Sequence, residues 1–269
     1  MNLLAGPWAG EFGWQVSAWI PYLRAISHLY SKIVVVCRPG DWYLYKDFAD
    51  DYIYHNPKGN PDMWYARRFP TKKPKMPKFI EKLYPFGRNH HGYEIIKPSK
   101  KSCIHGLRKF FKYGEGESTF YNAFDIVIHA RAEDKYGQSD RNWPIDKYER
   151  LLRHLRKDSL VKVCSVGTKA YHIPGTEDLR NIALSELCNI MNHSKMTIGP
   201  SSGVMHLSHL CGCPILVWTY NKWEKGIKAT NKERYKKIWR AWDSPIKVID
   251  EYGWQPSVRA VEKEVRKLL

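Results

Sequence analysis

The chain has 269 residues, of which 43% are hydrophobic, and it carries a formal net charge of +17. That length suffices for one large domain or two small ones, and no apolar run of about eighteen residues predicts a membrane-spanning helix. The N-terminal MNLLAGPWAGEFGW has no basic start and meets Glu11 early, so it does not predict a secretory signal. We therefore expect a cytoplasmic protein whose six cysteines are mostly buried and reduced.

The positive charge is concentrated in two segments. Residues 66–112 hold fourteen Lys or Arg and two acids, and residues 222–240 hold eight Lys or Arg and two acids. Both segments also contain aromatic residues, such as Phe69 and Trp239. A solvated lysine-rich surface is one interpretation. We favour a localised positive surface for a polyanionic partner, because clustered like charges repel one another unless a partner compensates them.

The N-terminal part begins with a short apolar segment, residues 1–4, and a glycine-rich turn. Apolar residues at helical spacing then predict a helix over 15–30, with a kink or a late start at Pro21. The run KIVVVC, residues 32–37, predicts a buried strand that ends at an Arg-Pro-Gly turn. Residues 50–120 are rich in proline and lysine and show only weak periodicity.

Strands and helices alternate in the rest of the chain. Apolar runs predict strands at 124–129, 160–166, 195–199 and 215–218. Helices are predicted at 147–157, 184–194, 204–210 and 257–269, with Ser185 capping the second of them. This order is typical of a parallel sheet with helices on both faces. We place a domain boundary between residues 120 and 121.

The stretch GPSSGVMHLSHLCGCPILVW, residues 199–218, places a glycine and serine turn between a strand and a helix. Ligands of doubly wound sheets bind beyond the carboxyl ends of strands, where helix N-termini offer N–H groups and a partial positive charge. Gly199 and Gly203 would let the backbone approach a phosphate, and Ser201 and Ser202 would donate hydrogen bonds. A serine N-cap on an ordinary core helix is the competing interpretation.

This stretch resembles the signature of the heptosyltransferase-type glycosyltransferases of the GT-B fold, Gly-x-[Asp/Ser]-[Ser/Thr]-Gly-x-Met-His-Leu. The matching residues are Gly199, Pro200, Ser201, Ser202, Gly203, Met205, His206 and Leu207. The family usually has an acid at the position of Ser201. The segment IVIHARAEDKYGQSDRNWPIDKY is similar to the start of the family's second domain. It is equally similar to the His-x-Arg-x-x-Asp motif of α1,6-fucosyltransferases, at His129, Arg131 and Asp134.

The resemblance implies an α/β, GT-B-like fold: two Rossmann-like domains facing each other across a cleft, with a C-terminal helix that packs back. Residues 1–120, with their basic insertion, would hold the acceptor, and residues 121–269 a UDP- or GDP-sugar. No other cofactor and no metal is expected, because a helix dipole and basic side chains would neutralise the leaving diphosphate.

The implied donor-binding residues are Arg131, Gly167, Thr168, Gly199, Ser201, Ser202, Gly203 and His206. Arg131 suits a phosphate clamp because its guanidinium is permanently charged and bidentate. A surface arginine is the alternative for this residue, and a core histidine is the alternative for His206.

An inverting transfer also needs a base that takes the proton of the acceptor hydroxyl. The resemblance places this base in the glycine-containing loop after the first strand, where Glu11 lies between Gly10 and Gly13, with Asp134 in reserve. A helix N-terminal acid that only stabilises the dipole is the alternative for Glu11. Gly10, Gly13 and Trp14 would line the acceptor, and a core position is the alternative for Trp14.

Two acceptors and one non-enzymatic function are open. The basic segments with their aromatic residues favour DNA, with a flipped hydroxymethylated pyrimidine as acceptor. In character the chain is similar to phage-encoded enzymes that glycosylate such bases, which would place it in the host cytoplasm. The residues predicted to bind DNA are Arg67, Arg68, Lys72, Lys73, Lys75, Lys78, Lys225 and Lys228. The alternatives are a lipopolysaccharide or lipid-linked saccharide at a membrane surface, and a nucleic-acid-binding module without activity.

Overall fold

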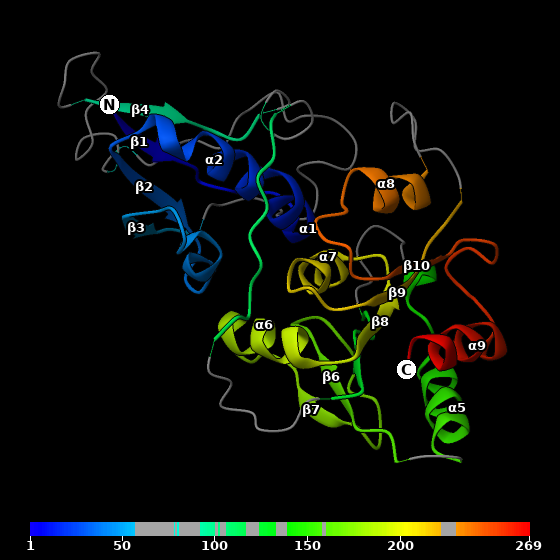
Figure 1. Cartoon of the computed structure of the whole chain (residues 1–269). Helices are drawn as coiled ribbons and strands as arrows, with labels where there is room; N and C mark the ends of the chain where they lie inside the picture. The colour runs from blue at the N-terminus through cyan, green and yellow to red at the C-terminus, as the bar shows by residue number, and fades with distance from the viewer. Residues whose placement is uncertain are drawn as a thin grey trace. The chain divides into compact units, whose positions relative to one another are not determined.

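A computed structural model describes residues 1–56, 78, 80, 92–99, 102, 106–116, 124–132, 139–157, 160–221 and 230–269. The chain divides into two compact units, Met1–Phe111 and Lys112–Leu269. Each unit is built on a parallel sheet of its own (Figure 1). The position predicted for the domain boundary, between residues 120 and 121, lies outside the described residues.

The sheet of the first unit has the strand order β3-β2-β1-β4, and all of its neighbouring strands are parallel. Its strands are β1 (Asn2–Ala5), β2 (Lys32–Cys37), β3 (Asp51–Tyr54) and β4 (Tyr93–Ile96). Leu4 lies opposite Val34 on one side and Ile95 on the other, in the buried apolar centre of this sheet. The predicted strand 32–37 is confirmed. The strands β3 and β4 were not predicted, because both lie in the part of the chain, residues 50–120, that shows only weak periodicity.

Helical structure follows β1 without a break from Phe12 to Leu29. It consists of α1 (Phe12–Trp14), the π-helical turn η1 (Gln15–Trp19), α2 (Ile20–Ile26) and the 3₁₀ turn η2 (Ser27–Leu29). The helix therefore begins before the predicted residue 15. The irregularity expected at Pro21 takes the form of the π-helical turn, which ends two residues before it. Proline has no N–H with which to continue the α-helical hydrogen bonds, and π-helical turns are one way to absorb such a defect.

The sheet of the second unit has the order β10-β9-β8-β5-β6-β7, again with all strands parallel. Its strands are β5 (Ile126–Ile128), β6 (Val163–Val166), β7 (Glu177–Leu179), β8 (Met196–Pro200), β9 (Ile215–Trp218) and β10 (Ile246–Ile249). Numbered within the unit, this is the order 3-2-1-4-5-6 of dinucleotide-binding sheets. The order reverses between β5 and β8, which makes the carboxyl ends of these two strands the expected ligand position.

Helices cover both faces of this second sheet, as predicted (Figure 1). They are α5 (Ile145–Leu155), α6 (Leu184–His193), α7 (Gly203–Leu210), α8 (Asn231–Lys237) and α9 (Val258–Leu268), preceded by the 3₁₀ turn η5 (Ser139–Arg141). Alternate residues of β9 point to opposite faces: Ile215 and Val217 pack with α7 and α8, whereas Leu216 and Trp218 pack with α5 and α9. The C-terminal helix therefore packs back onto its own unit.

Two predicted details of this unit are wrong. The N-cap of α6 is Ala183 rather than Ser185, and Glu186 accepts the N–H of Ala183 at 3.3 Å. Ser185 therefore lies inside the first turn, where a serine side chain cannot cap. The strand predicted to begin at residue 160 begins at Val163, and Leu160 is 99% exposed.

The described cysteines agree with the expectation from the sequence. Five of them are free and buried, namely Cys37, Cys164, Cys188, Cys211 and Cys213, and Cys103 lies outside the described residues. No helix in the described part of the chain is long and apolar enough to cross a membrane.

Candidate functional site

The turn between β8 and α7 lies at the point where the strand order of the second sheet reverses. β8 ends at Pro200 and α7 begins at Gly203, so Ser201 and Ser202 form the turn. The resemblance predicted a donor site here, and the structure places these serines at the carboxyl edge of a parallel sheet. That edge is where doubly wound sheets bind their ligands.

Two polar atoms at the start of α7 are buried without a hydrogen-bond partner among the described residues. They are the hydroxyl oxygen of Ser202 and Nδ1 of His206. Ser202 stands at the N-cap with extended backbone angles, yet its side chain makes no capping hydrogen bond. Buried polar atoms without a partner are rare and cost free energy. Since the serine does not act as an ordinary N-cap, these two atoms favour a ligand at the helix N-terminus.

Ser201 is held by three hydrogen bonds. Its N–H donates to the Trp218 oxygen at 2.9 Å, and its own main-chain oxygen accepts from Arg141 Nη2 at 2.5 Å. Its hydroxyl lies 3.0 Å from the hydroxyl of Tyr235 on α8. Neither Arg141 nor Tyr235 was predicted to contact this turn. The local pattern gave no signal for either, because they reach the turn from 60 and 34 residues away.

Two arginines occupy the same edge of the sheet. The Arg141 guanidinium lies over the Trp254 ring, 4.5 Å from its centre. Arg131, which follows β5, is only 5% exposed and donates from Nη1 to Asn142 Oδ1 at 2.6 Å. Gln255 donates to the main-chain oxygen of Asn142 at 3.0 Å and so fixes the turn that carries Arg141. The structure therefore does not support a simple surface position for Arg131.

His206 lies in an aromatic cluster. Its ring stacks on Tyr235 at a centroid distance of 5.2 Å and meets Trp239 edge-on at 4.4 Å. The side chain is 9% exposed, and burial, with a smaller effect of nearby Arg234, lowers its pKa to about 3. The imidazole is therefore neutral at neutral pH. It can offer a hydrogen bond to a ligand but no positive charge.

Two glycines predicted to bind the donor have a packing role. A Cβ atom on Gly199 would lie 2.7 Å from the main-chain oxygen of His129. Gly167 has a φ of +113°, and a Cβ there would lie 2.7 Å from the His129 ring. The backbones after β6 and within β8 therefore approach His129 in a way that only glycine permits. Thr168, next in the chain, is exposed at the carboxyl edge of β6.

The predicted acceptor loop follows β1 in the first unit. Glu11 is half-buried and stands at the N-cap of α1 with extended backbone angles. Its main-chain oxygen accepts from Trp8 Nε1 at 3.2 Å and from the Gln15 N–H at 3.1 Å. The preceding Gly10 is buried and Trp14 is half-buried, whereas Gly13 accepts the Ser17 hydroxyl on its main-chain oxygen at 2.6 Å. The loop is thus a defined structure at the carboxyl edge of the first sheet.

A second carboxylate, which the sequence did not indicate, lies at this edge. Asp41 follows β2, the strand next to β1, and begins the 3₁₀ turn η3 (Asp41–Tyr45). Gln15 Nε2 donates to its carboxylate at 2.8 Å and to the Tyr45 hydroxyl at 3.2 Å. Burial raises the pKa of Asp41 despite this hydrogen bond. The sequence around Asp41 did not indicate this contact, because its partner Gln15 lies 26 residues away in the chain.

Several predicted residues lie outside the described part of the chain. They are Asp134, Arg67, Arg68, Lys72, Lys73, Lys75, Lys225 and Lys228. Lys78 is described and is exposed. The described residues contain no group of three or more His, Cys, Asp or Glu arranged to hold a metal ion.

Comparisons with known proteins give similarity of structure but none of sequence. No family model matches the chain, and no curated protein sequence matches it. A glycosyl transferase of family 9 from Veillonella parvula has 11% identity over 99% of this chain and 96% of its own, with a TM-score of 0.61. The E. coli ADP-heptose LPS heptosyltransferase II has 12% identity over 99% and 98%, with a TM-score of 0.62.

A third similar structure is the iron-containing dodecameric glycosyltransferase TibC from enterotoxigenic E. coli H10407. It has 14% identity over 90% of this chain and 62% of its own, with a TM-score of 0.52. At such identities the likeness concerns the fold. The predicted α/β, GT-B-like fold with two parallel sheets is confirmed.

Proposed function

We propose that this protein is a glycosyltransferase that moves a sugar from a nucleotide-sugar donor to a hydroxyl group of a saccharide acceptor. The observation that carries the proposal is the pair of buried, unpartnered atoms at the start of α7, Ser202 Oγ and His206 Nδ1. They lie at the helix N-terminus at the reversal of a 3-2-1-4-5-6 sheet, where sugar nucleotides and dinucleotides bind. The GT-B-like fold supports the same reaction class.

The donor diphosphate would bind at the N-terminus of α7. Its oxygens would accept hydrogen bonds from the first N–H groups of the helix and from the Ser202 hydroxyl, and Arg141 would lie beside them. When the bond between the anomeric carbon and the diphosphate oxygen breaks, negative charge develops on the departing nucleoside diphosphate. Groups already fixed in place stabilise that charge without reorganisation, and Arg141 is fixed by its bond to Ser201.

The position of Ser201 distinguishes this chain from the family pattern, which usually has an acid there. Here the Ser201 hydroxyl is engaged with Tyr235 and the residue is buried. We therefore propose that Ser201 shapes the turn, and that Ser202 supplies the hydroxyl that contacts the donor.

Glu11 is the proposed general base. It would accept the proton of the acceptor hydroxyl as the new bond to the anomeric carbon forms. Its place at the carboxyl edge of the first sheet, on a loop fixed by two hydrogen bonds to its own main-chain oxygen, suits this role. Asp134 is the second candidate.

The acceptor is proposed to be a saccharide of the lipopolysaccharide type. One of the similar structures is a heptosyltransferase named for lipopolysaccharide, and none of the three is named for DNA. The predicted hydroxymethylated pyrimidine and the phage-type function thus gain no support from the comparisons. Most of the basic residues that favoured them lie outside the described part of the chain.

Metal independence is part of the proposal, since Arg141 and the start of α7 would supply the positive charge that a metal supplies elsewhere. One of the similar structures, TibC, is an iron-containing protein, so metal independence needs its own test. Activity that survives dialysis against EDTA is expected, and its loss and recovery with added metal would contradict this part.

The donor site is tested by calorimetric binding of UDP, GDP and ADP to two serine variants. Ser202→Ala removes a buried hydroxyl that has no partner among the described residues, so we expect unchanged or slightly higher stability but weaker binding of the preferred diphosphate. Ser208→Ala is the matched control on the same helix, because its hydroxyl donates to Thr197 Oγ1 at 2.6 Å. It should lose stability and keep its affinity. Equal affinity of Ser202→Ala and wild type would contradict the site.

The reaction and its acceptor are tested by a transfer screen. The protein is incubated with UDP-, GDP- and ADP-sugars and with either lipopolysaccharide-type saccharides or hydroxymethylated DNA, and the products are identified by mass. Transfer to saccharide is the expected result. Transfer to the DNA base would replace the acceptor and keep the donor site, and salt-sensitive DNA binding without any diphosphate binding would replace the enzyme by a binding module.

A further inference from the structure

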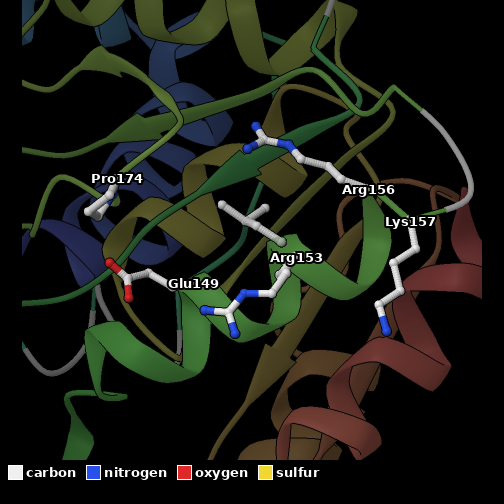
Figure 2. A pocket seen from close by; sticks show the side chains of 6 residues that line it. Glu149, Arg153, Arg156, Lys157 and Pro174 are labelled. Atoms are coloured by element: carbon white, nitrogen blue, oxygen red, sulfur yellow. The ribbon is translucent and has the colours of Figure 1, made fainter.

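A hollow of about 540 Å³ lies beside the C-terminal end of α5 in the second unit, and the proposed reaction makes no use of it. Its lining residues are Glu149, Leu152, Arg153, Arg156, Lys157 and Pro174. Figure 2 shows Arg153 and Arg156 extending toward the side where Glu149 and Pro174 lie, whereas Lys157 points away from them. The hollow thus lies between the helix α5 and the segment that leads into β7.

The hollow is electropositive, because three cations and one carboxylate line it. Arg156 is fixed by a hydrogen bond from Nη2 to the Gly175 oxygen at 2.7 Å. Arg153 and Lys157 are exposed and have no ion pair with any described residue. Glu262, on the neighbouring helix α9, already pairs with His154 and Arg266. Among the described residues, Glu149 is therefore the one carboxylate that faces the positive charge of the hollow.

An apolar side chain stands next to these cations. Leu160 is 99% exposed, the highest value among the large hydrophobic residues that the structure describes. It follows Lys157 by three residues, so chain connectivity keeps the two within about 11 Å. A leucine in water forgoes the stabilisation that burial of its apolar side chain gives. The exposed leucine and the neighbouring cations together fit a partner surface that covers Leu160 and also presents anions to the cations.

The hollow lies at the opposite edge of the sheet from the proposed donor site. α5 starts after the carboxyl end of β5 and leads to the amino end of the parallel strand β6, so its last turn lies at the amino edge. The hydrogen bond from the Asp125 N–H to the Lys162 oxygen, at 2.9 Å, marks the same edge. A ligand here would not compete with a donor at α7.

We propose that Arg153, Arg156, Lys157 and Leu160 form a contact site for an anionic lipid bilayer. The lipid phosphates bind in the cationic hollow, and the Leu160 side chain enters the interfacial region next to them. Basic residues close to an apolar side chain are the composition that holds proteins at anionic membrane surfaces. A soluble phosphate would use the cations but leave Leu160 in water, and a nucleic acid backbone would do the same. Of these three ligands, only the bilayer accounts for both features.

The test measures binding of the full chain to vesicles of mixed phosphatidylglycerol and phosphatidylcholine by co-sedimentation. The double variant Arg153→Gln/Lys157→Gln keeps the fixed Arg156 and removes the two charges that pair with no described residue. We expect its partition coefficient to fall about 25-fold, or about fivefold for each charge. Leu160→Asn should reduce binding about tenfold, and this loss should persist at high salt, where the charge effect is screened.

The control addresses the general basicity of the chain. Lys236→Gln/Lys237→Gln removes the same charge from the last turn of α8, a helix on the other face of the sheet. This variant should bind vesicles like wild type. The proposal is overturned if it loses as much binding as the α5 variant, or if the α5 variant binds like wild type.

Two further arms separate the sources of phosphate. Inorganic phosphate that stabilises the wild type but not the α5 variant, without vesicle binding, would assign the hollow to a soluble anion and overturn the bilayer site. Loss of duplex DNA binding in the α5 variant, with vesicle binding unchanged, would assign it to nucleic acid. Each of these measurements is independent of sugar transfer, so failure of the bilayer site and failure of the proposed function are distinguishable.

Discussion

The hydroxyl oxygens of Ser201 and Tyr235 lie 3.0 Å apart, which ties the turn before α7 to the helix α8. The family pattern usually has an acid where Ser201 stands. In this chain a tyrosine on another helix partners the residue instead, and both side chains are buried. The serine is therefore part of a buried polar pair.

Removal of the Tyr235 hydroxyl tests this pair. Tyr235→Phe should lower the free energy of unfolding by about 1 kcal/mol, because the Ser201 hydroxyl loses its partner. The double variant Tyr235→Phe/Ser201→Ala should recover most of that loss, since neither hydroxyl remains. Urea unfolding of both variants measures the effect. Tyr171→Phe, at an exposed position, is the control, and an equal loss in that variant would contradict the pairing.

Arg141 is expected to bind the donor diphosphate. Arg141→Gln should weaken nucleoside diphosphate binding about 10- to 100-fold, the range for a hydrogen bond to a charged group. Calorimetric titration of the folded variant measures this loss. Arg150→Gln removes an arginine that pairs with Asp146 on the helix surface, and it should leave the affinity unchanged. If both variants bind alike, the diphosphate lies elsewhere.

Glu11 is expected to act on the acceptor. Glu11→Gln keeps the size of the side chain but cannot take a proton, so kcat should fall on the order of 10²–10⁴-fold while donor binding is retained. Steady-state transfer assays, with calorimetry as the control for donor binding, measure the two quantities. Activity within a few-fold of wild type would move the role to Asp134, and the same assay on Asp134→Asn would then decide.

Two buried histidines of α7 should make the protein less stable in acid. Burial lowers the pKa of His206 to about 3 and that of His209 to about 4, from an ordinary value of 6.5. His209 Nε2 also accepts the N–H groups of Ala241 and Trp242, which requires the neutral ring. The unfolded chain takes up these protons below pH 6.5 and the folded chain does not. Stability is therefore complete above pH 6.5 and falls as the pH drops toward 4.

The slope of that fall approaches about 1.4 kcal/mol per pH unit for each histidine. Urea unfolding at a series of pH values measures it. His206→Phe keeps an aromatic ring against Tyr235 and removes one titrating group. The pH dependence of its unfolding free energy should therefore be smaller by the contribution of one histidine. A pH dependence equal to that of wild type would show that His206 does not stay neutral in the fold.

Replacement of Gly199 by a larger residue is expected to cause a packing defect. Gly199→Ala would place a Cβ 2.7 Å from the His129 oxygen, and such overpacking costs about 1–3 kcal/mol. Gly116→Ala is the matched control, because a Cβ there would meet nothing closer than 3.9 Å. Thermal or urea unfolding compares them. Donor affinity per folded molecule should be unchanged, and a selective loss of affinity would instead make Gly199 part of the ligand site.

Elements defined by their own residues were predictable. The strands at Lys32–Cys37 and Ile215–Trp218 have the bounds expected from the sequence, because each is an unbroken apolar run between turn residues. The turn at Ser201–Ser202 was placed correctly before α7 for the same reason. The strand Glu177–Leu179 was missed, because two of its three residues are acidic and no apolar run marks it.

The class of fold and the place of the turn before α7 could be predicted, because apolar periodicity and glycine and serine residues act over a few neighbouring positions. The side chains that meet at this turn could not be predicted, because they come from distant parts of the chain. Arg141 reaches Ser201 across 60 residues and Gln15 reaches Asp41 across 26. These pairs form because the order of the strands in each sheet brings distant residues together. That order depends on how whole helix and sheet faces pack against one another. It leaves no pattern in the residues on either side of the contact.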